Sequence, residues 1–154
     1  MIRDVKGNIL TPASKDDEFI TIVCQQVNCV GVMGAGLAKQ IKARFPSVFE
    51  QYKSRCAERR DNLGTVLYCA TDNQAGYVVA NLFGQVGFGT DARQTDYSAL
   101  KRCFLRIKQD YPKATIRIPY RLGCGLAGGD WNVVKGLIEA VLGNNNIEIW
   151  HLPE

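Results

Sequence analysis

Residues 114–142, ATIRIPYRLGCGLAGGDWNVVKGLIEAVL, pass from an apolar stretch through a glycine-rich segment into a helical pattern. Residues 114–120 are rich in β-branched types, which predicts a strand, and the apolar residues of 131–142 recur at helical spacing. Four glycines fall within the eleven residues 121–131 between them. Glycine lets backbone N–H groups approach a ligand closely, and the start of a helix adds partial positive charge. The junction therefore predicts a site for a phosphate-bearing ligand.

A second junction of the same kind lies nearer the N-terminus. Residues 19–28, FITIVCQQVN, predict a buried strand, residues 31–36, GVMGAG, a glycine-rich loop, and residues 37–45, LAKQIKARF, a helix. Pro46 ends that helix, and Ser47 is expected to cap the helix that follows. In α/β folds, ligands bind where strand ends give way to such loops. Two such loops can hold two phosphates, or one diphosphate with a sugar beyond it.

The rest of the chain alternates strands and helices. Further strands are predicted at the start of residues 1–10 and over 64–72, 76–85 and 147–152, and a further helix over 95–111 with Thr95 as its cap. The segment DNQAG, residues 72–76, predicts a turn between two antiparallel strands. This pattern predicts one α/β domain over residues 1–154, with a mixed sheet covered by helices on both faces.

Composition narrows the function classes. Hydrophobic residues make up 46% and charged residues 22% of the 154 residues, and the net charge is +4. That mild positive charge suits an anionic small ligand without requiring nucleic acid. No apolar run is long enough to span a membrane and the N-terminus does not resemble a signal peptide, so we expect a cytoplasmic protein with no membrane partner.

The cysteines do not indicate a metal site. Six cysteines are scattered without a C-x2-C pair, and His151 is the only histidine. With no secretion signal they are expected to be reduced thiols, and neither a metal nor a cofactor is predicted.

Other ligand-binding motifs fit less well. GCGLAG, residues 123–128, matches G-x-G-x-x-G, and Glu148 lies about 20 residues further on, as in dinucleotide-binding proteins. A dinucleotide-binding fold needs several further units after this motif, so a nicotinamide enzyme stays a distant alternative. No G-x4-G-K-[ST] motif is present. Cys124 is followed six residues later by Asp130 rather than arginine, which argues against a cysteine phosphatase.

The two loops, in this order and spacing, resemble the macro domain family, which binds ADP-ribose. The matching segments are VKGNIL (residues 5–10), VNCVGVMGAGLA (27–38) and PYRLGCGLAGGDW (119–131). The resemblance implies a three-layer α/β/α sandwich, a mixed sheet of roughly six strands, and an ADP-ribose cleft across the strand ends. It is closest to the branch that contains bacterial and phage proteins processing ADP-ribose 1''-phosphate and related hydrolases.

The resemblance also implies the ligand-binding residues. Adenine is expected near Asn8 and Ile9, and a ribose hydroxyl near Asn28. The backbone of Gly34, Ala35, Gly36 and Leu37 is expected to face the distal ribose and a phosphate. The diphosphate is expected on Gly123, Cys124, Gly125 and Leu126.

Some positions depart from the family pattern. Many members have an aspartate where Asn8 stands; the carbonyl oxygen of Asn8 can still accept from the adenine amino group. Gly31 replaces a second asparagine of the first loop. One hydrolase branch pairs an aspartate after G-C-G-L with a lysine on a middle strand. Here that aspartate is Ala127 and the strand end NLFGQ has no lysine, which argues against that mechanism.

Two residues are candidate catalytic groups. Asp130 lies at the loop-to-helix junction, where its carboxylate could orient a water near the distal ribose, although the same position suits a helix cap. Gln85, at the end of NLFGQ, is expected to point into the same cleft. Arg93 and Phe88 are candidate contacts to a phosphate and to the ribose, and Trp131 is expected to be a packing residue.

The expected reaction is hydrolysis of a group from the distal ribose, with ADP-ribose 1''-phosphate as the first substrate. Two alternatives stay open: removal of ADP-ribose from a modified protein or nucleic acid, and a binding module without turnover. We expect a monomer that binds ADP-ribose or a derivative.

Overall fold

Strands and helices alternate along the chain, as predicted. The computed structural model describes residues 1–14, 19–71 and 76–152. The elements are β1 (Ile2–Lys6), β2 (Thr21–Val27), α1 (Gly36–Arg44), α2 (Pro46–Glu58), β3 (Val66–Ala70), β4 (Tyr77–Phe83), α3 (Tyr97–Asp110), β5 (Thr115–Pro119), α4 (Trp131–Leu142) and β6 (Asn146–His151). The predicted turn over 72–76 lies mostly outside the described residues.

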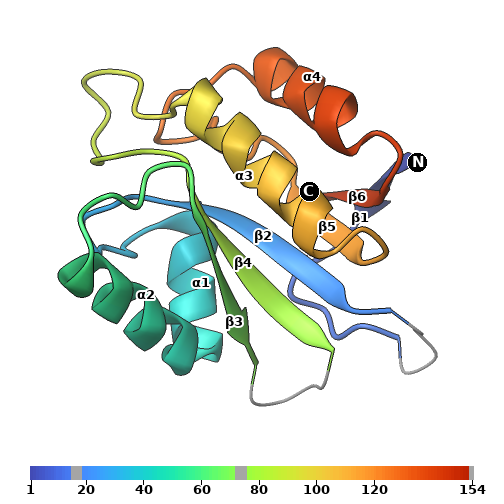
Figure 1. Ribbon diagram of the computed structural model, residues 1–154, viewed down its shortest axis with the longest axis horizontal. Helices are drawn as coiled ribbons and strands as arrows, with labels where there is room; N and C mark the ends of the chain where they lie inside the picture. Colours follow the sequence, from blue (N-terminus) through green and yellow to red (C-terminus); the bar gives the residue numbers. More distant parts are fainter. Residues whose placement is uncertain (15–18, 72–75, 153–154) are drawn as a thin grey trace.

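The six strands form one sheet in the order β1-β6-β5-β2-β4-β3. Neighbouring strands are parallel except for β3, which runs antiparallel to β4. Helices α1 and α2 cover one face and α3 and α4 the other (Figure 1). The predicted α/β fold and mixed six-stranded sheet are therefore confirmed.

The central strand β2 shows why the sheet is buried on both faces. Ile22 and Cys24 pack in the core under α3 and α4, whereas Val23, between them, packs in the core under α1 and α2. Successive side chains of a strand point to opposite faces, so a nearly continuous apolar run is buried by helices on both sides.

Two of the predicted helix caps are wrong. Asp96 caps α3, with its side chain accepting from the N–H of Ala99 at 3.0 Å, while Thr95 bonds to the 121–129 loop. Helix α2 begins at Pro46, so Ser47 lies inside its first turn. Proline at the first helical position needs no amide hydrogen, and this replaces a side-chain cap.

The cap at α4 is confirmed: the carboxylate of Asp130 accepts from the N–H of Asn132 at 2.9 Å. All six cysteines are free thiols, as predicted. Among the helices of the described residues, none is both long enough and apolar enough to cross a membrane.

Candidate functional site

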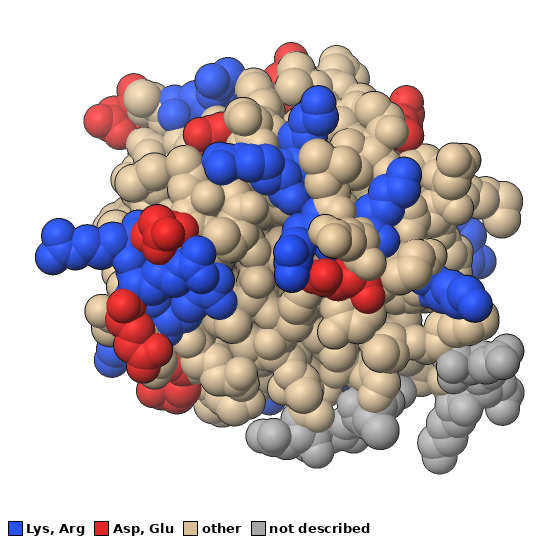
Figure 2. Space-filling model, in the orientation of Figure 1, with Lys and Arg blue, Asp and Glu red and all other residues tan. Residues whose placement is uncertain are grey.

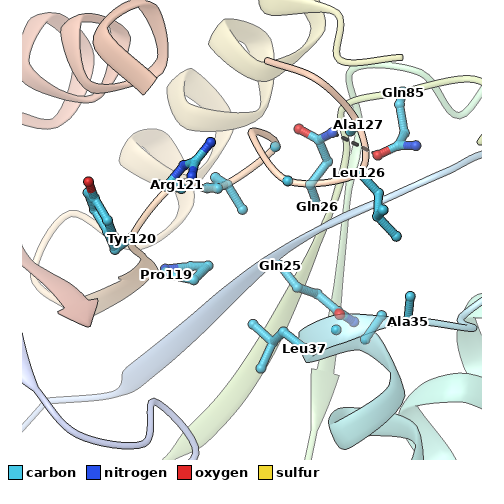
Figure 3. Close-up of a pocket in the computed structure, with 15 residues that line it drawn as sticks. Gln25, Gln26, Ala35, Leu37, Gln85, Pro119, Tyr120, Arg121, Leu126 and Ala127 are labelled. Carbon is cyan, nitrogen blue, oxygen red and sulfur yellow. Dashed lines mark hydrogen bonds between the residues drawn. The ribbon is translucent and has the colours of Figure 1, made fainter. Parts of the chain in front are cut away.

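Three adjoining cavities follow the carboxyl ends of the parallel strands. The central cavity, about 280 Å³, lies between the loop before α1 and the loop before α4 (Figure 3). It shares Gly36, Leu37, Pro119 and Tyr120 with a second cavity of about 770 Å³ beside Trp150, which we call the Trp150 cavity. It shares Ala35, Gln85 and Leu126, among others, with a third cavity of about 360 Å³ beside Phe88, which we call the Phe88 cavity. The three cavities thus form one groove, at the edge of the sheet predicted for the ligand.

One side of the central cavity is the start of α1. Ala35 occupies the N-cap position and provides no side-chain hydrogen bond. The N–H groups of residues 36–38 donate to no acceptor in the described part of the chain; Lys39 is the first helical residue whose N–H does, bonding the carbonyl of Ala35 at 3.3 Å. Uncommitted N–H groups at a helix start carry partial positive charge and favour an anion.

The facing side is the glycine-rich loop before α4. Its shape is held by bonds from the N–H of Gly128 to Gly125 and from the N–H of Gly129 to Gly123, the latter at 2.9 Å. The N–H groups of residues 125–127 donate to no acceptor among the described residues. Two sets of free donors therefore line the same cavity.

The glycines are required by geometry at two positions of this loop. Gly123 has a φ of +71° and Gly128 a φ of +76°, both in the left-handed region. A side chain at either position would strain the backbone that presents the free N–H groups.

Gln26 and Thr95 connect this loop to the strands. The Nε2 of Gln26 donates to Oε1 of Gln85 at 2.8 Å and to Oγ1 of Thr95 at 2.9 Å. The hydroxyl of Thr95 in turn donates to the carbonyl of Gly123 at 2.6 Å. Gln85 lines both the central and the Phe88 cavity, and its own Nε2 donates to the carbonyl of Gly87 at 2.7 Å.

Arg121 is the charged side chain among the described residues that line the central cavity, and sequence reasoning missed it. Its φ is +65°, unusual for a residue with a side chain, and its Nη2 donates to the carbonyl of Cys124 at 3.2 Å. A basic residue two positions before the first glycine of the loop was the available signal. Strained backbone of this kind is common at functional sites.

Asn28 braces the loop before α1. Its Oδ1 accepts from the N–H groups of Val30 and Val32 and lies 2.6 Å from the hydroxyl of Tyr52, and its Nδ2 donates to the carbonyl of Val32. Burial raises the pKa of Tyr52, so its hydroxyl stays protonated. Asn28 lines the Phe88 cavity, but a ribose hydroxyl would have to share these bonds.

The Phe88 cavity carries no charge: none of the described residues that line it is ionisable. Asp130 is exposed, caps α4, and is not among the described lining residues of the three cavities. Arg93 stacks over the ring of Tyr97 at 4.4 Å, whereas Phe88 lines its cavity while 62% exposed.

Cys124 points away from the groove. Its thiol is buried, which raises its pKa, and its N–H is committed to the carbonyl of Arg121 at 2.8 Å. The expected contact to a diphosphate therefore depends on the glycines beside it. A protonated thiol is a poor nucleophile.

Asn8 and Ile9 line the Trp150 cavity together with Tyr120, Trp150 and His151. Tyr120 stacks on His151 with ring centroids 4.3 Å apart. Trp131 also meets Tyr120, in an edge-to-face geometry with ring centroids 5.3 Å apart, and packs on the core, as predicted. Aromatic walls with a few polar groups are typical of small-molecule pockets.

Together these features define an α/β protein with a groove across its strand ends, lined on two sides by residues with free backbone N–H groups. The sequence profile of the macro domain matches residues 24–138, well over half of the chain. The chain belongs to the macro domain family.

Relatives of two named activities are similar to this chain. A DNA ADP-ribosyl glycohydrolase of Mycobacterium tuberculosis is 29% identical over 110 residues, covering 71% of this chain and 31% of that protein. The chain thus spans about a third of that protein's length. An ADP-ribose 1''-phosphate phosphatase of Debaryomyces hansenii is 24% identical, covering 97% of each protein. The solved macrodomain of Mycobacterium tuberculosis DarG has a TM-score of 0.75 at 25% identity, covering 100% of this chain and 98% of that one.

Proposed function

We propose that the groove binds ADP-ribose and that the protein hydrolyses a group from the distal ribose of an ADP-ribose derivative. One observation carries the proposal: the free N–H groups of residues 36–38 and 125–127 line one cavity from two sides. A diphosphate between them would meet both sets of donors, the positive end of α1, and the side chain of Arg121.

The two ends of the groove differ in a way that orients the ligand. The Trp150 cavity is the larger and has aromatic walls, which suits a nucleobase. The Phe88 cavity is smaller and has the amides of Asn28 and Gln85 on its walls, which suits a sugar. The distal ribose would therefore lie beside Phe88. The macro domain relatives with hydrolase names support turnover at this end.

The leaving group is the point on which two candidates differ. The family resemblance and the Debaryomyces relative favour ADP-ribose 1''-phosphate. A phosphate monoester carries about 1.5 to 2 negative charges at neutral pH and is usually held by cationic side chains. The uncharged Phe88 cavity favours the second candidate, release of ADP-ribose from a neutral acceptor such as a nucleobase.

The candidate catalytic groups of this proposal are Gln85 and Asp130. Asp130 is outside the described lining of the three cavities, so its second carboxylate oxygen, left free while Oδ1 caps α4, would have to orient a water from the far side of the glycine loop, and the variant below tests this role. Gln85 would position the ribose from between the two cavities. Since no ionisable side chain of the described residues lines the Phe88 cavity, a binding module without turnover is the outcome to be tested against.

The experiment offers the protein two substrates and one ligand. Phosphate release is measured from ADP-ribose 1''-phosphate, ADP-ribose release from a single-stranded oligonucleotide ADP-ribosylated on a base, and the affinity for ADP-ribose by calorimetry. We expect ADP-ribose to bind and one substrate to turn over, with the active substrate deciding the leaving group. Binding without turnover would contradict hydrolysis, and absence of binding would contradict the assignment of the groove.

Asp130→Asn is the informative variant. Asparagine caps a helix about as well as aspartate but has no carboxylate, so the fold is kept and only the charge is lost. We expect hydrolysis to fall by about a hundredfold or more, the range of one lost acid–base group. Unchanged turnover would remove Asp130 from the mechanism.

A further inference from the structure

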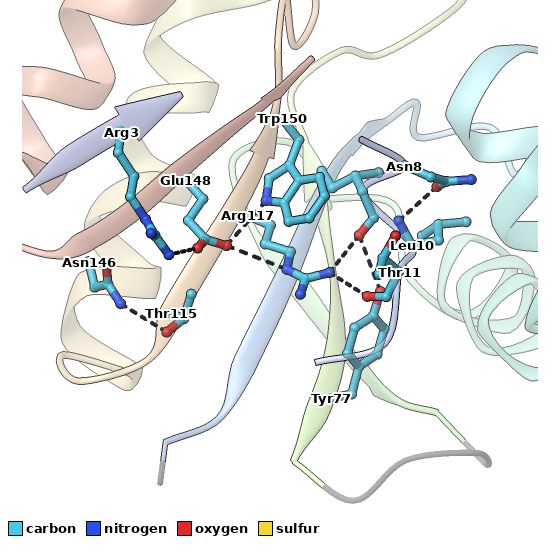
Figure 4. Close-up of polar contacts among 11 residues, drawn as sticks. Arg3, Asn8, Leu10, Thr11, Tyr77, Thr115, Arg117, Asn146, Glu148 and Trp150 are labelled. Carbon is cyan, nitrogen blue, oxygen red and sulfur yellow. Dashed lines mark hydrogen bonds and ion pairs between the residues drawn. The ribbon is translucent and has the colours of Figure 1, made fainter. Parts of the chain in front are cut away.

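The amide of Asn8 has a fixed orientation. Its Oδ1 accepts from the backbone N–H of Leu10 at 2.9 Å, and the N–H of Thr11 closes the turn on the carbonyl of Asn8 at 2.9 Å. A backbone N–H can only donate, so the oxygen of the Asn8 amide must face Leu10 and its NH₂ group must face away. Figure 4 shows the nitrogen of Asn8 turned away from Leu10.

The turn that carries Asn8 is anchored from the sheet. Arg117 of β5 is buried and donates from Nη1 to the carbonyls of Ile9 at 3.0 Å and Thr11 at 2.5 Å (Figure 4). Its guanidinium lies over the ring of Trp150 at 4.5 Å, and its Nε is 3.6 Å from a carboxylate oxygen of Glu148. Because both carbonyls are held by a buried charge, the backbone of the turn is fixed, and with it the N–H of Leu10 that sets the orientation of the Asn8 amide.

Two neighbouring residues that line the Trp150 cavity therefore each carry a free donor. The Nδ2 of Asn8 and the N–H of Ile9 donate to no acceptor in the described part of the chain, and both residues line the Trp150 cavity. No aspartate or glutamate is among the described residues that line this cavity. Lys6 adds a further donor at the rim, and His151 faces Asp4 at 2.8 Å.

Purines differ in what they offer to such a pair. On the edge that carries N7, adenine presents an acceptor beside the 6-amino donor, whereas a 6-oxopurine presents two acceptors, N7 and O6, side by side. The opposite edge of a 6-oxopurine carries an N1–H donor beside O6, so the proposed fit is to the N7 edge. If the NH₂ group of Asn8 faced the 6-amino group of adenine, two donors would meet and neither would have an acceptor. We propose that the groove takes a 6-oxopurine nucleoside diphosphate-ribose at least as tightly as ADP-ribose, with Asn8 as the residue that determines this specificity. The inference rests on the proposed function, because it concerns the base of the ligand proposed there.

The test compares ADP-ribose with inosine diphosphate-ribose, whose base is the 6-oxo counterpart of adenine. Dissociation constants are measured by calorimetry for the unchanged protein and for Asn8→Asp. The carboxylate keeps the bond to the N–H of Leu10 and offers the base only acceptors. We expect the unchanged protein to bind the inosine compound as tightly as ADP-ribose or more tightly, and Asn8→Asp to shift the ratio about tenfold toward ADP-ribose.

Asn146→Asp provides the matched control. It adds the same negative charge at the start of β6, on an exposed side chain paired with Thr115, and we expect both affinities to stay unchanged. Binding of ADP-ribose at least tenfold tighter than the inosine compound, or an unchanged ratio in Asn8→Asp, would overturn this inference alone. Failure of both ligands to bind would instead overturn the proposed function and, with it, the base specificity.

Discussion

Arg117 is a buried charge on which both the fold and the nucleoside end of the groove depend. Its side chain and that of Glu148 are each 8% exposed, and Glu148 is also paired with Arg3 and hydrogen-bonded by Trp150. Arg117→Met removes the charge while keeping an apolar stem of similar length. The carboxylate of Glu148 then keeps Arg3 as its charged partner and the hydrogen bond from Trp150, and the carbonyls of Ile9 and Thr11 lose their charged donor.

The expected loss can be worked from these contacts. Removing one partner of a buried ion pair costs about 3–5 kcal/mol of the free energy of unfolding, because the other charge stays buried. The surviving bond from Arg3 to Glu148 puts our expectation near the lower end, at about 3 kcal/mol. Replacing both partners by apolar residues is often close to neutral, so Arg117→Met/Glu148→Met should recover about 2 kcal/mol of that loss.

Urea unfolding followed by tryptophan fluorescence measures this, since Trp150 stacks on the guanidinium. The affinity for ADP-ribose is measured on the same proteins. We expect the double variant to regain stability but not affinity, because the carbonyls of the Asn8–Thr11 turn still lack their donor. A loss below about 1 kcal/mol for Arg117→Met would refute the ion-pair reasoning, and a double variant with full affinity would refute the anchoring of the turn.

Three further outcomes are expected. Gly129→Ala places a Cβ 2.6 Å from the carbonyl oxygen of Gly123, so the glycine loop must shift to relieve the clash. We expect calorimetry to show the affinity for ADP-ribose reduced by about tenfold or more. Unchanged affinity would contradict the dependence of binding on the close approach of Gly129 to Gly123. Asp130→Ala should lower the free energy of unfolding by about 1 kcal/mol in urea titration, whereas Asp130→Asn should not, because only alanine removes the cap of α4. Burial raises the pKa of Cys69 from 9.0 to about 11, so this thiol does not affect the free energy of unfolding below pH 9 but lowers it as the pH rises toward 11. In thermal melts at pH 9 and pH 11, Cys69→Ala should show a smaller drop in Tm than the unchanged protein. An equal drop in Tm would contradict burial of this thiol as the cause.

Local sequence patterns were sufficient to predict most of the helices and strands. The β-branched run of residues 21–27 forms β2, and the helical spacing over 131–142 forms α4 with the predicted cap. Periodicity reports which face of an element is buried, and this information is contained in neighbouring residues. The two wrong cap predictions have different causes: a tertiary contact at Thr95 and a neighbouring residue at Ser47. The hydroxyl of Thr95 bonds to a loop that lies far along the chain, and Pro46 makes a cap at Ser47 unnecessary.

In the groove, too, features that depend on neighbouring residues were predictable from the sequence, whereas contacts between distant segments were not. The glycines of both loops were predicted to present backbone donors, and the structure places both loops on one central cavity. No local pattern indicated that Arg121 would adopt a left-handed conformation beside the central cavity, or that Gln26 would join Gln85 to the glycine loop. These contacts depend on which strands become neighbours, and strand order is set by the packing of the whole sheet.

The sequence by itself determined the elements, the family resemblance and the two loops that supply free N–H groups, since each depends on residues within a short segment. Only the tertiary structure decided what those loops enclose. It brought an arginine of β5 beneath the turn after β1, turned the NH₂ group of Asn8 away from Leu10, and left the Phe88 cavity without charge. The physical reason is that buried polar groups must find partners, and those partners come from whichever segments the sheet brings together.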